Sequence, residues 1–201
     1  MNAILKTAGN PENQDRGLVL RDGQRIIVCV ADGAGGYGGG AEAAGLAVDF
    51  VGQNAFDLTN VEACAESLRQ MDEPIAKHSI AGETTCALAV ITPEEIFGAS
   101  VGDSGVWLIT EKGSHLDLTR RQQRKPFIGS GDIWPVPFHQ SNQPGVLLLA
   151  TDGLLKYTSA EHIVGTCRER PVEAAAPRLI ELVRYSSGAL PDDVTLILTR
   201  L

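Results

Sequence analysis

The segment from Thr84 to Leu118 limits the folds open to this chain more than any other feature. Four short strand-like runs follow one another there, at 85–91, 96–101, 106–110 and 115–118. The breaks between them are rich in turn residues and only a few positions long. Parallel neighbours need a crossover connection of a dozen or more residues, so these runs are expected to form an antiparallel meander.

The rest of the chain adds helices and further strands. The chain is expected to begin with a hairpin, because Asp22-Gly23 separates the β-forming runs 18–20 and 25–30. Apolar spacing predicts helices at 41–56, 61–78, 159–168 and 172–186, and buried strands at 146–150 and 194–199. The stretch 120–142 lacks periodicity and is expected to be a surface loop. This order favours an α+β fold of packed layers.

Composition narrows the class of protein. With 201 residues and 43% apolar content, the chain is expected to form a single domain, 1–201, around one core. Its net charge of -8 argues against a nucleic-acid partner. No apolar run has the length of a signal-peptide core or a membrane span, so a cytoplasmic protein without membrane contacts is expected. The four widely spaced cysteines are expected to be reduced core residues, and no feature indicates an oligomeric state.

Aspartates stand at the ends of several predicted strands. Asp32 and Asp152 each follow an apolar run and precede a glycine, while Asp103 and Asp192 lie at other strand boundaries. Each of them alone is explained equally well as a turn residue or a helix cap. Together they form the carboxylate-rich set that Mg²⁺ and Mn²⁺ prefer. Zinc is not favoured, because the four histidines are scattered singly.

Six short motifs occur in order along the whole chain, with predicted strands between them. They are Asn13-Gln14-Asp15, Val30-Ala31-Asp32-Gly33-Ala34-Gly35-Gly36, Gly82-Glu83-Thr84-Thr85, Val101-Gly102-Asp103-Ser104, Leu147-Leu148-Leu149-Ala150-Thr151-Asp152-Gly153 and Asp192-Asp193-Val194-Thr195. Together they resemble the motifs of the metal-dependent protein phosphatases of type 2C. The resemblance implies a four-layer α-β-β-α sandwich, with two antiparallel sheets flanked by helices and a shortened flap beside the active site.

The resemblance also implies a metal site. Its expected cofactors are two Mg²⁺ or Mn²⁺ ions and a weaker third ion. Asp32 would bridge the first two ions, Asp152 and Asp192 would complete the coordination of one, and the Gly33 carbonyl would bind the other. Asp103 would help Asp152 to hold the third ion.

The activity implied is that of a serine/threonine protein phosphatase. Water bridging the two metals would attack the phosphorus directly, made nucleophilic at neutral pH because the cations lower its pKa. Asp15 would position this water. The expected partner is a phosphorylated protein or peptide, and Arg16 is a candidate for binding its phosphate.

Several positions depart from the family pattern. Gln14 replaces a common glutamate, Ala34 replaces a histidine found in some relatives, and no arginine directly precedes Asn13. Gln14, the missing arginine and the short flap leave open an inactive phosphatase-like regulatory or binding module. A preference for small phosphate esters also stays open, because the groove that would decide it lies in the least patterned region of the chain. The complete set of aspartates favours the enzyme. A basic cluster at 120–125 is either a solvated loop or a site that attracts acidic phosphopeptides.

Two other motif matches lack the context that their functions require. Residues 33–38 match the dinucleotide fingerprint G-x-G-x-x-G, with Asp57 near the position of a ribose-binding acid, but the predicted meander does not suit parallel strands. Residues 98–102 match the nucleophile elbow G-x-S-x-G around Ser100. That elbow requires a following helix, and another strand is predicted instead.

Overall fold

The computed structural model describes residues 2–9, 12–34, 38–169 and 171–201. Its strands are β1 (Asn2–Ala8), β2 (Asp15–Asp22), β3 (Arg25–Ala34), β4 (Glu83–Thr84), β5 (Cys86–Ile91), β6 (Glu95–Val101), β7 (Gly105–Thr110), β8 (His115–Asp117), β9 (Val136–Ser141), β10 (Gly145–Ala150) and β11 (Val194–Arg200). The helices are α1 (Gly40–Gln53), the 3-10 turn η2 (Ala55–Asp57), α2 (Val61–Ala76), α3 (Asp152–Leu155), α4 (Ala160–Glu169) and α5 (Val172–Val183).

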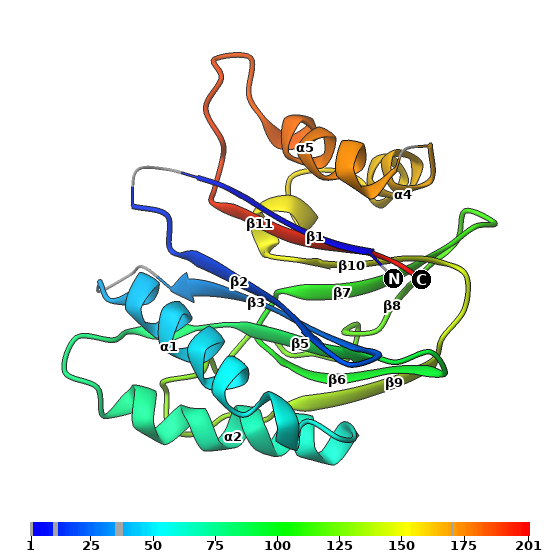
Figure 1. The fold of residues 1–201 in the computed structure, drawn as a ribbon. Coiled ribbons are helices and arrows are strands. Elements are labelled where there is room, and N and C mark those ends of the chain that lie inside the picture. Colours follow the sequence, from blue (N-terminus) through cyan, green and yellow to red (C-terminus); the bar gives the residue numbers. More distant parts are fainter. Residues whose placement is uncertain (1, 10–11, 35–37, 170) are drawn as a thin grey trace.

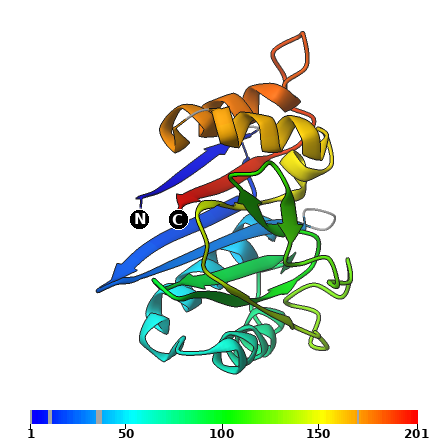
Figure 2. The same cartoon turned by 90° about the vertical axis from the view of Figure 1, so that its right-hand side faces the viewer.

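Two antiparallel sheets pack face to face, and helices cover both outer faces (Figures 1 and 2). One sheet has the order β1-β11-β10-β7-β8 and carries α4 and α5 on its outer side. The other has the order β2-β3-β5-β6-β9, with β4 paired to the end of β3, and carries α1 and α2. The predicted four-layer sandwich is therefore confirmed.

The central strands are buried on both faces, which explains their continuous apolar sequences. In β5, Ala87 and Ala89 pack between the sheets, whereas Leu88 and Val90 pack against the helices. The same alternation occurs in β10, and successive side chains of a strand always point to opposite faces. Each sheet thus separates two apolar layers and meets water mainly at its ends and edges.

Most predicted elements are confirmed with small changes at their ends. The β2–β3 hairpin pairs Asp22 with Arg25 across the Gly23-Gln24 turn, and the predicted helices correspond to α1, α2, α4 and α5. All four cysteines are buried and unbridged. Among the described helices, none combines the length and apolar content needed to cross a bilayer.

The expectation that the chain begins with the hairpin is wrong. A preceding strand, β1, pairs antiparallel with the last strand, β11, from Asn2↔Arg200 to Ala8↔Val194. Its sequence contains Asn2, Lys6 and Thr7 among apolar residues, as suits an edge strand with one exposed side. The helix α3 was also not predicted, because its four residues are too few to show a periodicity.

The predicted meander is correct within its two halves and wrong at its centre. β5 pairs with β6 and β7 pairs with β8, but β6 and β7 belong to different sheets. The short connection at Gly102, Asp103 and Ser104 carries the chain from one sheet to the other, and Gly102 has a φ of 88°. Turn residues alone do not distinguish a hairpin from such a crossing.

The region 120–142 is not a loop throughout. Its end forms β9, an edge strand paired with β6, in which Phe138 is the buried side chain. Pro137 within it is compatible with an edge position, where one side of the backbone needs no ladder partner. The proline and the short alternation obscured this strand in the sequence. The remaining stretch, 118–135, connects β8 to β9, and its identity as a shortened flap stays a prediction.

Two glycines provide a matched test of the packing. A Cβ on Gly98 in β6 would lie 2.0 Å from the Leu88 carbonyl oxygen and 2.6 Å from the Phe138 ring, whereas a Cβ on Gly45 in α1 would meet no atom within 4 Å. We expect Gly98→Ala to lower the free energy of unfolding by about 1–3 kcal/mol, the usual cost of overpacking. Gly45→Ala is expected to raise it by roughly 0.5–1 kcal/mol. Urea unfolding of both variants measures these changes. A free energy of unfolding for Gly98→Ala equal to that of the wild type would contradict the close packing around Gly98.

Candidate metal centre

The predicted metal ligands meet around one pocket. This pocket has a volume of about 230 Å³. The described residues that line it are Asp32, Gly33, Ala34, Thr85, Asp103, Arg124, Phe127, Asp152, Lys156 and Asp192. The pocket therefore contains all five residues that the sequence motifs assigned to metal binding.

The topology explains why residues so distant in sequence converge. Asp32 lies near the end of β3, and Asp152 follows the end of β10 and opens α3. Asp192 precedes β11, and Asp103 lies in the connection that crosses between the sheets. These strand ends lie at one end of the sandwich, the end at which the β3 arrow terminates in Figure 1.

Hydrogen bonds to Thr84 and Thr85 fix the backbone of Asp32. Its N–H donates to Thr85 Oγ1 over 3.0 Å, and its carbonyl accepts from Thr85 N over 2.8 Å and from Thr84 Oγ1 over 2.9 Å. Thr85 Oγ1 also lies 2.7 Å from Ser104 Oγ. The motif Gly82-Glu83-Thr84-Thr85 thus joins β3 to the connection that carries Asp103. Sequence reasoning identified this motif and assigned it no role.

Gly33 brings the end of β3 against the start of α1. A Cβ at Gly33 would lie 2.3 Å from both the carbonyl carbon and the carbonyl oxygen of Gly40. A Cβ at Gly40 would in turn lie 2.5 Å from Gln14 Oε1. Both glycines are therefore required for close packing, and the Gln14 side chain lies against the beginning of the helix.

Asp15 lies beneath the pocket. It is the register partner of Asp32 in the β2–β3 ladder and is almost fully buried. Thr151 Oγ1 donates to Asp15 Oδ2 over 2.8 Å and accepts from Thr195 N over 2.9 Å. This links Asp15 in one sheet to the ends of β10 and β11 in the other. Asp193 adds a second link, because its Oδ2 accepts from Gln14 N over 2.8 Å.

Burial and mutual repulsion raise the pKa values of the central carboxyl groups. The pKa of Asp32 is raised to about 9, mainly by burial and in part by the negative charges of the nearby Asp15, Asp152, Asp192 and Asp103. Burial also raises the pKa of Asp15 to about 7, opposed in part by its hydrogen bond from Thr151. The pKa of Asp192 is raised mainly by burial. Such a cluster is stabilised by any cation that enters it.

Two cationic side chains contact carboxylates of the pocket. Arg124 Nε lies 2.7 Å from Asp103 Oδ2, and Lys156 Nζ lies 3.3 Å from Asp152 Oδ2. Sequence reasoning missed both as site residues. Lys156 was recognisable only from its i, i+4 spacing to Asp152, and Arg124 was one of four basic residues in a cluster.

The residue types in the pocket offer the oxygen ligands that a hard divalent cation prefers. Four aspartates and Gly33 line the pocket, and histidine and cysteine are absent among its described lining residues. Within the part of the chain that the structure describes, no three Asp, Glu, His or Cys side chains are already gathered tightly enough to hold an ion. The residues for a metal are therefore present at one place, but their side chains are not drawn together.

The remaining positions singled out in the sequence are distributed as follows. The Arg16 side chain donates from Nη1 to the carbonyls of Asn13 and Asp15, both over 2.8 Å, and does not line the pocket. Ala34 does line it. Gly35 and Gly36 of the second motif lie outside the described residues.

The two competing motifs have no supporting context. Asp57 lies in the η2 turn and lines a different pocket, and the sheets are antiparallel, as a dinucleotide fold is not. Ser100 is buried in the middle of the sandwich within β6, donates to Gln122 Oε1, and is followed by a strand. Neither the dinucleotide nor the nucleophile-elbow interpretation is retained.

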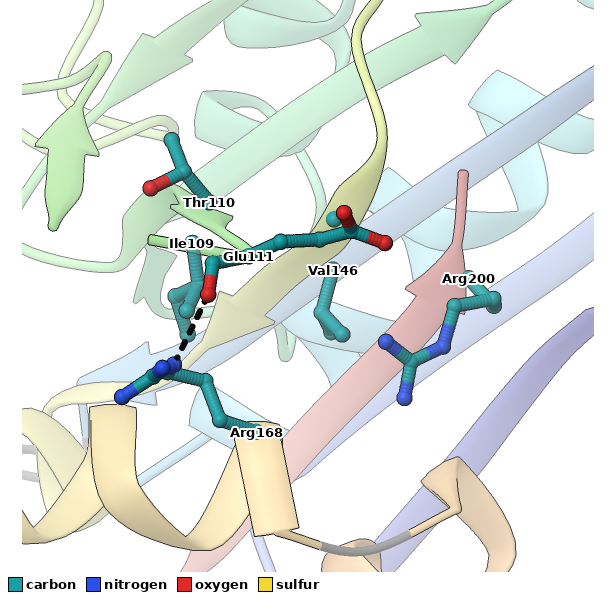
Figure 3. A pocket seen from close by; sticks show the side chains of 7 residues that line it. Ile109, Thr110, Glu111, Val146, Arg168 and Arg200 are labelled. Carbon is teal, nitrogen blue, oxygen red and sulfur yellow. Dashed lines mark hydrogen bonds between the residues drawn. The ribbon is translucent and has the colours of Figure 1, made fainter. Parts of the chain in front are cut away.

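A larger pocket at the opposite ends of β7, β10 and β11 lacks this donor set (Figure 3). Its volume is about 400 Å³, and Glu111 is the carboxylate among its described lining residues. Arg168 and Arg200 also line it, and Arg168 Nε donates to the Glu111 carbonyl over 3.2 Å. It is larger than the pocket of the aspartates, but its chemistry does not suit a cation.

Comparisons with known proteins agree with the site and the fold. The family model of protein phosphatase 2C matches residues 7–170. No curated protein sequence matches the chain.

Three solved structures resemble the fold along the entire chain. The serine/threonine phosphatase PstP/Ppp of Mycobacterium tuberculosis is 19% identical, with a TM-score of 0.84 over 100% of this chain and 98% of its own. A bacterial serine phosphatase is 20% identical, with a TM-score of 0.83 over 100% and 97%. Serine/threonine phosphatase Stp1 of Staphylococcus aureus is 19% identical, with a TM-score of 0.81 over 99% and 94%. At these identities the likeness shows the fold.

Cation binding predicts a change in thermal stability. With Mn²⁺ at a hundredfold excess over its Kd, the wild type is expected to gain about 2.7 kcal/mol, which raises Tm by roughly 5–10 °C. Asp32→Asn is expected to lose this gain and to be more stable than the wild type in EDTA, because it removes a carboxyl group whose ionised form is destabilised by burial and by its acidic neighbours. Asp49→Asn, at an exposed position of α1, is the matched control. Equal Mn²⁺ shifts in Asp32→Asn and the wild type would contradict the assignment.

The raised pKa values also predict a pH dependence of stability in EDTA. The folded state binds protons at Asp32 and Asp15 more tightly than the unfolded state does, since their pKa values rise from 3.8 to about 9 and about 7. The contribution of these two groups to the free energy of unfolding is therefore most favourable near and below pH 4. It is lost as the pH rises toward 9. Asp32→Asn is expected to flatten this decline. Thermal unfolding across this range measures it, and parallel pH profiles for both proteins would disprove the coupling.

Proposed function

The chain belongs to the protein phosphatase 2C family, and from this premise we propose that it is a metal-dependent serine/threonine phosphatase of phosphoproteins. By family it is a phosphoprotein phosphatase. The observation that supports the finer proposal is the convergence of Asp32, Asp103, Asp152 and Asp192 around one pocket. The proposed cofactors are two Mg²⁺ or Mn²⁺ ions.

Each carboxylate has a proposed role. Asp32 would contact both ions, with Asp152 and Asp192 on one side and the Gly33 carbonyl on the other. When bound, the two cations would supply an activated water and the positive charge that phosphate ester hydrolysis requires. Asp15 would orient that water, and the hydrogen bond from Thr151 would hold the Asp15 carboxylate in place. The bonds from Thr84 and Thr85 would keep Asp32 at a fixed position during the reaction.

A third ion at Asp103 and Asp152 would be weaker than the other two. Asp103 already contacts Arg124, and Asp152 already contacts Lys156. A cation at that position would have to displace one or both side chains. We therefore expect two ions to be sufficient for the activity.

The test of the proposal is turnover that depends on a divalent metal. We expect the wild type to hydrolyse an aryl phosphate and a phosphothreonine peptide with Mn²⁺ or Mg²⁺ and to be inactive in EDTA. Asp152→Asn is expected to reduce kcat/KM by roughly a hundredfold or more, the scale of losing one group that stabilises transition-state charge. Asp49→Asn, at an exposed position of α1 that does not line the pocket, should retain full activity.

The same assay distinguishes the alternatives. A folded wild type that binds Mn²⁺ but turns over neither substrate would support a regulatory or binding module instead. Turnover of the aryl phosphate with none of the peptide would indicate a small-ester phosphatase. Equal activity with and without EDTA would refute metal dependence.

A further inference from the structure

The phosphate group of a substrate needs a positively charged partner in this pocket besides any metal ion. Four aspartates line the pocket, and their carboxylates repel a phosphate dianion that enters it. The sequence candidate for this partner, Arg16, is directed toward backbone carbonyls at Asn13 and Asp15 and does not line the pocket. The cationic residues among the described lining residues are Arg124 and Lys156.

We propose that Arg124 binds the substrate phosphate. The inference deepens the proposed function and rests on it. The ion pair with Asp103 uses Nε of the guanidinium, and a guanidinium carries four further N–H donors on its two terminal nitrogens. A planar pair of such donors matches two phosphate oxygens, a geometry that a lysine ammonium does not offer. Arg124 can therefore contact Asp103 and a phosphate at the same time.

The backbone on both sides of Arg124 is fixed. On one side, Gln122 N donates to the Thr119 carbonyl over 2.8 Å, and Gln122 Oε1 accepts from Ser100 Oγ over 2.9 Å. On the other, Ile128 and Thr84 exchange two backbone hydrogen bonds of 2.9 Å, next to the Thr84 hydroxyl that holds Asp32. Arg124 is thus carried on a short segment tied to β6, which leads to Asp103, and to β4, which pairs with the end of β3 that carries Asp32.

Exposure and charge agree with a binding role. The Arg124 side chain is 67% exposed while its partner Asp103 is 26% exposed, so the guanidinium lies at the mouth of the pocket. The rest of the basic cluster does not line this pocket: Arg120 and Arg121 line a groove beside β9, and Lys125 lines a neighbouring pocket that shares Ala34 with it. Asp103 would orient Arg124, and a substrate phosphate would receive its remaining donors.

The experiment uses the Mn²⁺-loaded protein and inorganic phosphate as the probe, with binding measured by calorimetry. Arg124→Gln is expected to weaken phosphate binding roughly tenfold to a hundredfold, the factor of a lost charge-assisted hydrogen bond. It is expected to raise KM for an aryl phosphate and a phosphothreonine peptide by a similar factor, with a smaller change in kcat. Arg124→Lys should restore part of the loss, and Arg121→Gln, three positions away and outside the pocket, should behave as wild type.

Each outcome decides the assignment. Unchanged phosphate affinity and KM in Arg124→Gln would overturn it. A loss of kcat alone, with unchanged phosphate affinity, would also overturn it and would place Arg124 in support of Asp103. If the wild type binds phosphate through Arg124 without any turnover, the proposed function fails and the binding assignment stands. If the Mn²⁺-loaded wild type does not bind phosphate, the assignment is wrong.

Discussion

The burial of both faces of each sheet is the constraint on which the rest of the structure depends. Central strands such as β5 and β10 have apolar side chains toward the other sheet and toward the helices, so they offer no face for polar chemistry. Polar groups can be placed only where strands end. The carboxylates near the end of β3, after β10 and before β7 and β11 therefore meet at one end of the sandwich. They are held by strands that cannot shift without disrupting the core.

The mutual repulsion of the acids at that end of the sandwich is unfavourable, and neutral hydrogen-bond donors and cationic side chains offset part of it. The buried Thr151 donates to the Asp15 carboxylate, and the buried Thr84 and Thr85 hydrogen-bond to the backbone of Asp32. Arg124 and Lys156 contact the carboxylates nearer the rim. The buried Asp15 and Asp32 retain raised pKa values despite these contacts. A site arranged in this way gains free energy from divalent cations, which links the stability of the fold to its proposed chemistry.

Much of the fold and of the site could be predicted because both leave local traces in the sequence. The aspartates follow continuous apolar runs, so Asp32 and Asp152 were placed at strand ends without knowledge of the sheet order. The edge strands β1 and β9 were harder to predict because their sequences are partly polar. The crossing at Asp103 was not predicted because turn residues do not indicate whether the next strand joins the same sheet or the other one. Arg124 is found only from an ion pair between residues 103 and 124, a contact that depends on the loop path and not on any motif.

The claim that these carboxylates form a divalent metal site is tested most directly by crystals grown with Mn²⁺, using the anomalous scattering of manganese. The account predicts anomalous peaks inside the pocket bounded by Asp32, Asp152 and Asp192, with Gly33 within coordinating distance. Peaks absent from this pocket at saturating Mn²⁺, or found only at the surface, would contradict it.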